Sequence, residues 1–239
     1  GPSKMDGSPI VVIATGLRGS ENIKTGDMVQ TYILIDGIHP TEGVFEGKDV
    51  GICGDCPHRY VDGQGTCYVN PANGPLSVYN AWKRGNYPEM GLSEAAELLS
   101  GRTVRLGAYG DPAMVPVTVW DGILKNVRSW TGYTHQWKRY FARGMKRYCM
   151  ASVESVSEME RAHNSGWRTF RIRHASMELM KGEIVCPASA EGGKRLNCVE
   201  CKACDGGRVG KASVAIIAHG PVWKRQRLEL MVLPTSVAA

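Results

Sequence analysis

The sequence predicts one α/β domain built on a parallel sheet, and two observations support this prediction. From about residue 92 onward, short apolar strands alternate with amphipathic helices, and parallel neighbours in a sheet need such crossover helices. The chain also holds seven or eight candidate strands, which suits a compact or incomplete (β/α) barrel. An open doubly wound sheet is the alternative. With 239 residues, of which 43% are hydrophobic and 22% charged, the chain can form such a domain.

The expected elements follow one another along the chain. Two strands are expected early, at 11–15 and 30–35. An amphipathic helix carries Leu92, Ala95, Ala96 and Leu99 on one face and ends at Gly101. Pro116 opens a second helix, and a capping box of Ser157 and Glu160 opens a third. The remaining strands are expected at 104–109, 130–137, 148–153, 167–172, 183–186 and 213–218.

The domain is expected to span residues 5–239. Residues 1–4 are typical of the remnant left when an expression tag is removed, so we leave them out of the domain. No apolar run approaches the roughly 18 residues that a membrane span needs, and no leader pattern precedes the domain. We therefore expect an intracellular protein with no membrane partner.

Seven of the eight cysteines fall into two compact groups. The early trio lies in a loop at 51–68, and the late quartet lies in a loop at 186–206. The early trio is Cys53, Cys56 and Cys67, and the late quartet is Cys186, Cys198, Cys201 and Cys204. A C-x-x-C step lets two thiolates on one turn reach the same metal centre, whereas disulfide frameworks usually serve smaller domains. The sequence therefore predicts metal ligands. Cys149 lies in an apolar run and is expected to be a buried free thiol.

The cysteine spacing favours iron–sulfur clusters over zinc. The late quartet can close a [4Fe–4S] cluster, while the early trio leaves one iron open to a substrate or to S-adenosylmethionine. Pro follows Cys56 and Cys186, as it often follows iron–sulfur ligands. Thiolate zinc sites commonly use two C-x-x-C pairs, whereas this chain has one pair and one triple. Zinc remains the alternative, with His58 as a fourth ligand of the early trio. A single four-thiolate site drawn from both groups also fits.

Polar residues follow the predicted strands at their carboxyl ends, where α/β folds place their sites. They are Asp111, His135, Ser152, Glu154, Arg173 and His219. Of these, Asp111, His135, Glu154 and Arg173 are the candidate catalytic residues. Asp111 and His135 come first, because each follows an aromatic-containing strand with small residues that open space. If the sheet forms a barrel, both cysteine groups are expected to meet at one mouth.

The charge pattern suggests an anionic partner. The net charge is +6, and basic residues gather at 137–140, 143–147, 168–173 and 224–227. Such stretches, with their interleaved aromatic residues, can meet a nucleic acid or a nucleotide; an ordinary solvated basic surface is the alternative. The sequence has no P-loop, no G-x-G-x-x-G turn, no H-E-x-x-H and no G-x-S-x-G, which excludes the usual motifs of ATPases, dinucleotide enzymes, zincins and serine hydrolases.

Several stretches resemble uncharacterised tailed-phage proteins of the mycobacteriophage gene-product-88-like family. The resemblance lies in N-I-K-T-G at 22–26 with Q-T-Y at 30–32, in the Cys53 to Tyr68 segment, and in Y-G-D at 109–111 followed by Trp120 and G-Y-T at 132–134. The late C-P step followed by C-x-x-C-x-x-C is also similar. The resemblance implies a phage-encoded viral protein of the host cytoplasm. It further implies a TIM-barrel-like fold related to radical S-adenosylmethionine enzymes, with an iron–sulfur centre, and assigns no reaction.

One departure from those enzymes concerns the cofactor. Radical S-adenosylmethionine enzymes usually carry C-x-x-x-C-x-x-C, whereas ten residues separate Cys56 from Cys67 here. The expected function is therefore an iron–sulfur enzyme, acting on a nucleotide or nucleic acid, in which S-adenosylmethionine chemistry does not follow from the motif. The alternative is a non-catalytic protein, stabilised by zinc or an iron–sulfur cluster, that binds nucleic acid or inhibits a host protein.

Overall fold

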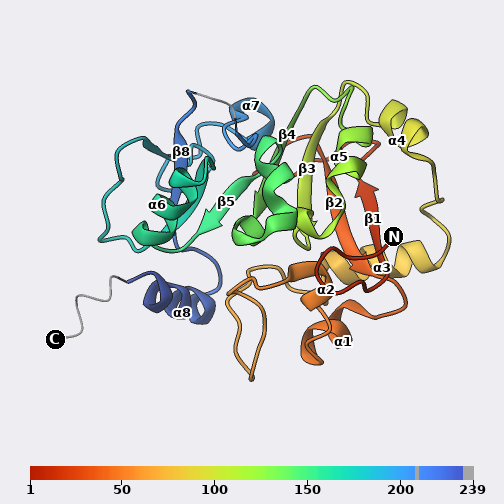
Figure 1. The fold of residues 1–239 in the computed structure, drawn as a ribbon, viewed down its shortest axis with the longest axis horizontal. Helices are drawn as coiled ribbons and strands as arrows, with labels where there is room; N and C mark the ends of the chain where they lie inside the picture. The colour runs from red at the N-terminus through yellow and green to blue at the C-terminus, as the bar shows by residue number, and fades with distance from the viewer. Residues whose placement is uncertain (208–209, 234–239) are drawn as a thin grey trace.

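The computed structural model describes residues 1–207 and 210–233 and shows an α/β fold (Figure 1). Its strands form one eight-stranded sheet in the order β1-β2-β3-β4-β5-β6-β8-β7. The strands are β1 Ile10–Thr15, β2 Met28–Ile35, β3 Thr103–Tyr109, β4 Ser129–Thr134, β5 Met150–Val153, β6 Thr169–Arg173, β7 Glu183–Val185 and β8 Ser213–Ile217. β1 pairs with β2 antiparallel, and every later pairing is parallel. The predicted α/β class is confirmed.

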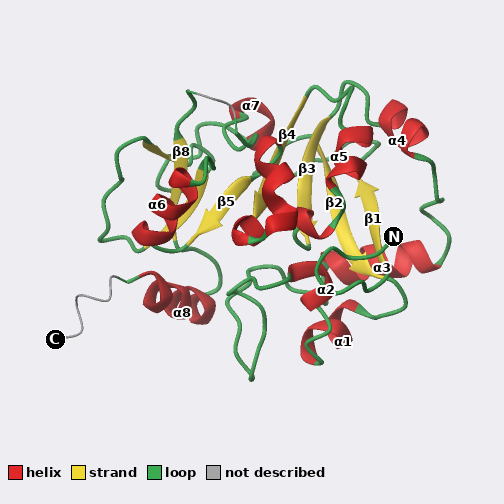
Figure 2. Ribbon diagram, viewed as in Figure 1, coloured by secondary structure: helices red, strands yellow, loops and turns green. Residues whose placement is uncertain are grey.

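Helices connect the strands and cover the sheet (Figure 2). They are α1 Pro40–Phe45, α2 Val50–Cys53, α3 Gly74–Lys83, α4 Leu92–Leu98, α5 Val117–Ile123, α6 Val156–Asn164, α7 Cys198–Cys201 and α8 Val222–Val232, with 3₁₀ turns η1 Pro112–Met114, η2 Gln136–Lys138 and η3 Tyr140–Arg147. α5 joins β3 to β4 and α6 joins β5 to β6, as parallel neighbours require. None of these helices is both long and apolar enough to cross a membrane.

The strand and helix predictions hold in the centre of the chain and differ at some ends. The strand expected at 130–137 stops at Thr134, because the amide of His135 turns away and donates to Asp111 Oδ2 at 2.8 Å. The N-cap of α6 is Ser155 rather than Ser157: Ser155 Oγ accepts from the Glu158 amide at 3.1 Å. α1, α2, α3, α7 and α8 were not predicted, and α2 and α7 lie in the two cysteine segments that were expected to be loops.

The N-terminal residues excluded from the predicted domain pack against it. Pro2 forms an isolated β-bridge with Pro9, and Ser3 is buried. The Lys4 amide donates to the Met114 carbonyl at 2.9 Å, which fixes this segment beside η1.

The hydrophobic core packs along the sheet. Contacts with this core fix the position of the residues that follow β3. Trp120 of α5 is fully buried, and its indole Nε1 donates to the Pro112 carbonyl at 2.9 Å. Gly110 has φ +79°, and a Cβ there would lie 2.7 Å from Ile33 Cβ, so only glycine allows this close turn. The Asp111 amide then donates to the Ile52 carbonyl at 2.6 Å. These contacts join α2, which ends in the first cysteine, to the carboxyl end of β3.

Candidate functional site

One cavity of about 230 Å³ lies against the sheet, and all seven clustered cysteines line it. Many of the strand residues that line it are spaced two apart, as residues on one face of a strand are. They include Arg105 and Gly107 on β3, Thr131 and Tyr133 on β4, Phe170 and Ile172 on β6, and Val214 and Ile216 on β8. Cys149 lies elsewhere, fully buried in the main core, as expected.

The early trio lies at the carboxyl end of the parallel strands. Cys53 is the last residue of α2, and the Cys56 amide donates to its carbonyl at 3.2 Å. The buried side chain of Gln136 spans this turn, since its Nε2 donates to the Cys53 carbonyl at 3.0 Å and its Oε1 accepts from the Asp55 amide at 3.3 Å. The Cys67 amide donates to the His58 carbonyl at 2.9 Å. The trio is thereby attached to the segment that follows β4.

The segment that carries Cys198, Cys201 and Cys204 is held toward the other end of the sheet, whereas Cys186 directly follows β7. The Cys198 amide donates to the carbonyl of Lys24, which precedes β2, at 3.0 Å. The Gly132 amide within β4 donates to the Cys204 carbonyl at 3.0 Å. Arg168, just before β6, donates to the Ala203 carbonyl at 2.7 Å and to Asp205 Oδ1 at 3.1 Å. Asn197 closes a capping box with Glu200 at the start of α7.

The two groups therefore share one cavity. α2, with Cys53, and α7, with Cys198 and Cys201, lie at opposite ends of the sheet (Figure 1). The α7 segment is anchored beside the amino ends of β2 and β6, whereas Cys186 directly follows β7 at its carboxyl end.

Electrostatic interactions connect the thiols within each group. Burial raises the pKa of Cys53 well above its usual value, and Cys56 and Cys67 raise it further. Burial raises the pKa of Cys204 to about 12, with a contribution from the other three thiols of its group, while a hydrogen bond with Tyr133 opposes this rise. Charged thiolates so close together repel one another, so a bound cation would stabilise them.

Basic side chains lie beside the late quartet. Burial raises the pKa of Cys198, whereas the charges of Arg105 and Lys24 act in the opposite direction. Arg105 Nη2 donates to the hydroxyl of Tyr68 at 2.6 Å. Arg105 and Tyr133 were not predicted as site residues; both lie on predicted strands, at 104–109 and 130–137, and the structure places them in the cavity lining.

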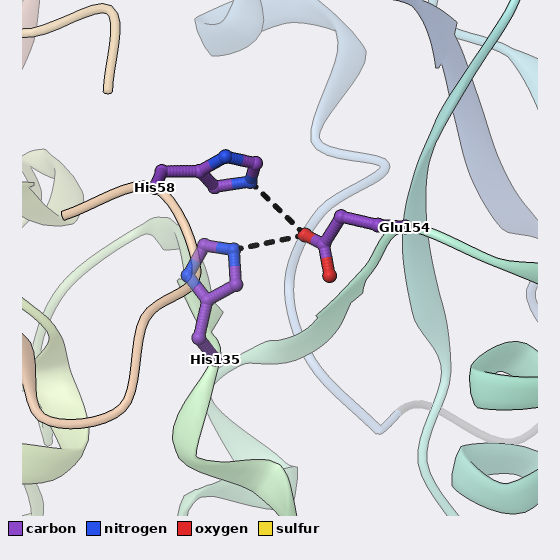
Figure 3. Close-up of side chains that lie close together, drawn as sticks. All are labelled: His58, His135 and Glu154. Atoms are coloured by element: carbon purple, nitrogen blue, oxygen red, sulfur yellow. Dashed lines mark hydrogen bonds and ion pairs between the residues drawn. The ribbon is translucent and has the colours of Figure 1, made fainter. Parts of the chain in front are cut away.

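The side chains of His58, His135 and Glu154 lie close together (Figure 3), and the two histidines line the cavity. The Nε2 atoms of both histidines lie 3.1 Å from the same oxygen, Glu154 Oε1. Within residues 1–207 and 210–233, this is the group of three or more histidine, cysteine, aspartate or glutamate side chains whose donor atoms all lie within 4.8 Å of one another. His58 therefore faces Glu154 and His135, and its Nδ1 faces Thr66 Oγ1 at 2.7 Å.

Glu154 and His135 each shift the pKa of the other toward its charged form. Burial alone would raise the pKa of Glu154, but hydrogen bonds with His135 and His58 outweigh it and lower the pKa. Burial acts to lower the pKa of His135, but the Cys56 thiol and Glu154 raise it well above its usual value. His135 therefore connects the early trio to Glu154.

Of the other predicted polar residues, three line the cavity, and Arg173 does not. Asp111 lines the cavity and anchors the turn after β4; burial raises its pKa. Ser152 and His219 also line the cavity. Arg173 is buried and pairs with Glu191, while its Nη1 donates to the Met177 carbonyl at 2.5 Å. Those contacts give Arg173 a structural role in the loop after β6.

Much of the basic sequence is neutralised within the fold. Arg168 pairs with Asp205, and Arg171 pairs with Glu183. Lys138, Arg139 and Arg147 likewise contact Glu158, Asp55 and Asp121. The stretches at 137–140, 143–147 and 168–173 therefore carry less free positive charge than the sequence suggests.

Comparisons with known proteins find no matching family model, no matching curated protein and no matching solved structure.

Proposed function

We propose that this protein is an iron–sulfur enzyme whose active site is the cavity between the early trio and the late quartet, and that its substrate is a nucleotide or a nucleic acid end. The observation that carries the proposal is the lining of one cavity by all seven cysteines at the two ends of one sheet. The eighth cysteine, Cys149, lies in the core.

The arrangement of the thiols supports two separate clusters. The thiols that raise the pKa of Cys53 and Cys67 belong to the early trio, and those that raise the pKa of Cys186, Cys198 and Cys204 belong to the late quartet. This grouping favours two separate sites, one with three cysteine ligands and one with four, rather than a single site drawn from both groups.

The spacing of the cysteines along the chain is the argument for clusters over zinc. Thiolate zinc sites commonly use two C-x-x-C pairs, whereas this chain has one C-x-x-C pair and one C-x-x-C-x-x-C triple, and Pro follows Cys56 and Cys186 as it often follows iron–sulfur ligands. When bound, a cluster would supply electrons or, at the early trio, an open iron.

We further infer that the sheet is an incomplete barrel that curves around the cavity. Residues of β3, β4, β5, β6 and β8 all line it, as strands of a curved sheet can. Within the described chain no strand pairing joins β1 to β7, so the hydrogen-bonded order has two edges. The remaining inferences, of a phage origin and of action in the host cytoplasm, rest on the family resemblance alone.

The cavity offers groups that suit a nucleotide. Tyr133 and Phe170 form an aromatic pair with ring centroids 4.5 Å apart on the cavity face, and aromatic rings bind bases by stacking. Lys24, Arg105 and Lys202 line the same cavity and can pair with phosphate oxygens. Here Phe170 and Tyr133 would hold the base, and the basic side chains would bind the phosphate beside the late quartet.

The cofactor is tested by purifying the protein without oxygen. We expect a brown protein that contains iron and acid-labile sulfide and has a broad visible absorption band that is lost on oxidation. A colourless protein with stoichiometric zinc and no iron would contradict the proposal.

The substrate class is tested by the variant Phe170→Ala. Because one base–aromatic stack is worth about 1–3 kcal/mol, we expect its affinity for nucleoside monophosphates to fall about 5- to 150-fold in equilibrium dialysis. Phe45→Ala is the matched control, since Phe45 is exposed on α1 and is not a cavity residue. If the wild-type protein binds no nucleotide, the alternative of a non-catalytic metal-stabilised protein is favoured.

A further inference from the structure

The side chains of His58, His135 and Glu154 form a group that contains no cysteine. We propose that these three side chains form a mononuclear binding site for a divalent transition metal ion at the wall of the cavity. This site goes beyond the proposed function and does not depend on it, because none of its three ligands is a cysteine.

The donor set and its spacing fit such an ion. Two imidazole nitrogens lie 3.1 Å from one carboxylate oxygen, and all three atoms lie within 4.8 Å of one another. An ion with bonds of about 2.0–2.2 Å holds its ligand atoms roughly 3–3.5 Å apart. Two histidines and one carboxylate bind Zn²⁺ in hydrolases and Fe²⁺ in non-haem oxygenases, in both cases with positions left open.

The ligands come from three separate parts of the chain. His58 follows the C-G-D-C turn, His135 follows β4 and Glu154 follows β5. All three are largely shielded, with side-chain exposures of 8%, 20% and 11% respectively. Burial of two histidines and one glutamate with their donor atoms pointing at one another (Figure 3) distinguishes this group from the exposed acidic groups that are common on protein surfaces.

Surrounding side chains orient the ligands as metal sites require. Thr66 Oγ1 lies 2.7 Å from His58 Nδ1, so it can accept the Nδ1 proton and leave Nε2 free to bind the ion. Asp111 Oδ2 accepts from the His135 amide, which fixes the turn that carries this ring. Glu158 Oε2 accepts from the Glu154 amide at 3.2 Å. His58 and His135 both line the cavity, so a bound ion would be open to a substrate there.

The competing interpretation is a metal-free ion-pair network, in which protons rather than an ion join the imidazoles to the carboxylate. The two interpretations differ in what Glu154→Gln does. The amide oxygen of glutamine, placed where Glu154 Oε1 lies, can accept a hydrogen bond from the Nε2–H group of each histidine, so the network and the fold survive. A neutral amide is a much poorer ligand for a divalent cation, so metal binding is lost.

The test uses protein purified without oxygen and dialysed against a chelator that removes mononuclear ions. Co²⁺ is added as the probe, and bound cobalt is measured by elemental analysis and by visible absorption. We expect the wild-type protein to bind one equivalent with ligand-field bands and without a thiolate-to-cobalt charge-transfer band. Glu154→Gln and His135→Gln are expected to lose this equivalent. Thr66→Val, which removes only the partner of His58, is expected to weaken binding about 10- to 100-fold.

His174→Gln is the matched control, because His174 lies in the loop after β6 and its Nδ1 contacts Ser176; it is expected to bind cobalt like the wild type. Near-ultraviolet circular dichroism shows whether each variant is folded. The proposal is overturned if folded Glu154→Gln keeps the equivalent, or if all the cobalt bound by the wild type shows the thiolate band. Iron and sulfide content is measured on the same samples, so loss of the clusters and loss of this site are told apart.

Discussion

Replacing Cys198 and Cys201 together by serine is expected to remove roughly half of the iron and sulfide, because the late quartet then retains only two of its thiolates. The double variant Cys53→Ser with Cys56→Ser is expected to remove the other half. Each remaining cluster should keep its own spectrum, since α2, which ends in Cys53, and α7, which spans Cys198 to Cys201, lie at opposite ends of the sheet. Elemental analysis and electron paramagnetic resonance of the reduced proteins measure both effects.

The pattern of loss separates the ways in which the cysteines can be used. A single site drawn from both groups would lose nearly all of its metal in either double variant. If the cysteines hold zinc instead, each double variant would lose zinc, and neither the wild type nor the variants would contain sulfide. Cys149→Ala is the control, because this thiol is buried in the core beside Gly132. A Cβ added at Gly132 would lie only 2.7 Å from the Cys149 sulfur. Full iron content is expected in that variant.

Arg171→Met is expected to destabilise the protein by about 3–5 kcal/mol, because it leaves Glu183 charged and unpaired in the interior. Both side chains of this pair are 0% exposed. Arg171 Nε donates to Glu183 Oε1 at 2.8 Å and its Nη2 donates to Oε2 at 2.6 Å. The pair links β6 to β7, directly before Cys186. Thermal unfolding should show a midpoint lower by roughly 10 °C.

The double variant Arg171→Met with Glu183→Leu is expected to recover most of that loss, since no buried charge remains. Arg147→Met is the matched surface control. Arg147 pairs with Asp121, but its side chain is 55% exposed, so a change of at most about 1 kcal/mol is expected. An equal loss in the single and double buried variants would show that packing, rather than the unpaired charge, causes the effect.

The fold class could be predicted because hydrophobic periodicity is a local property. The run from Ser213 to Ile217 reads as a buried strand and is one, and the apolar face of 92–99 reads as a helix and is one. The ends of the helices and strands were harder to predict, since they depend on partners that are distant in the sequence. The strand before His135 stops where Asp111 accepts its amide proton, 24 residues away along the chain. The short helices α1 and α2 carry too few residues for a clear period.

Within the candidate site, residue types were predictable and partners were not. His135 and Glu154 were selected because they follow strands, and the structure does bring them together. His58 was considered only as a ligand of the early trio, whereas it faces Glu154 across 96 residues of chain. Arg173 was selected in the same way; it is the last residue of β6 and pairs with Glu191 in the chain that follows this strand.

The sequence by itself determined the α/β class, the division of seven cysteines into a trio and a quartet, and the exclusion of Cys149, since spacing and hydrophobic pattern are written along the chain. Only the tertiary structure decided where these groups lie. Backbone hydrogen bonds from Cys198 to Lys24 and from Gly132 to Cys204 carry the late quartet across the sheet. Such bonds do not depend on side-chain identity, so they leave no motif in the sequence.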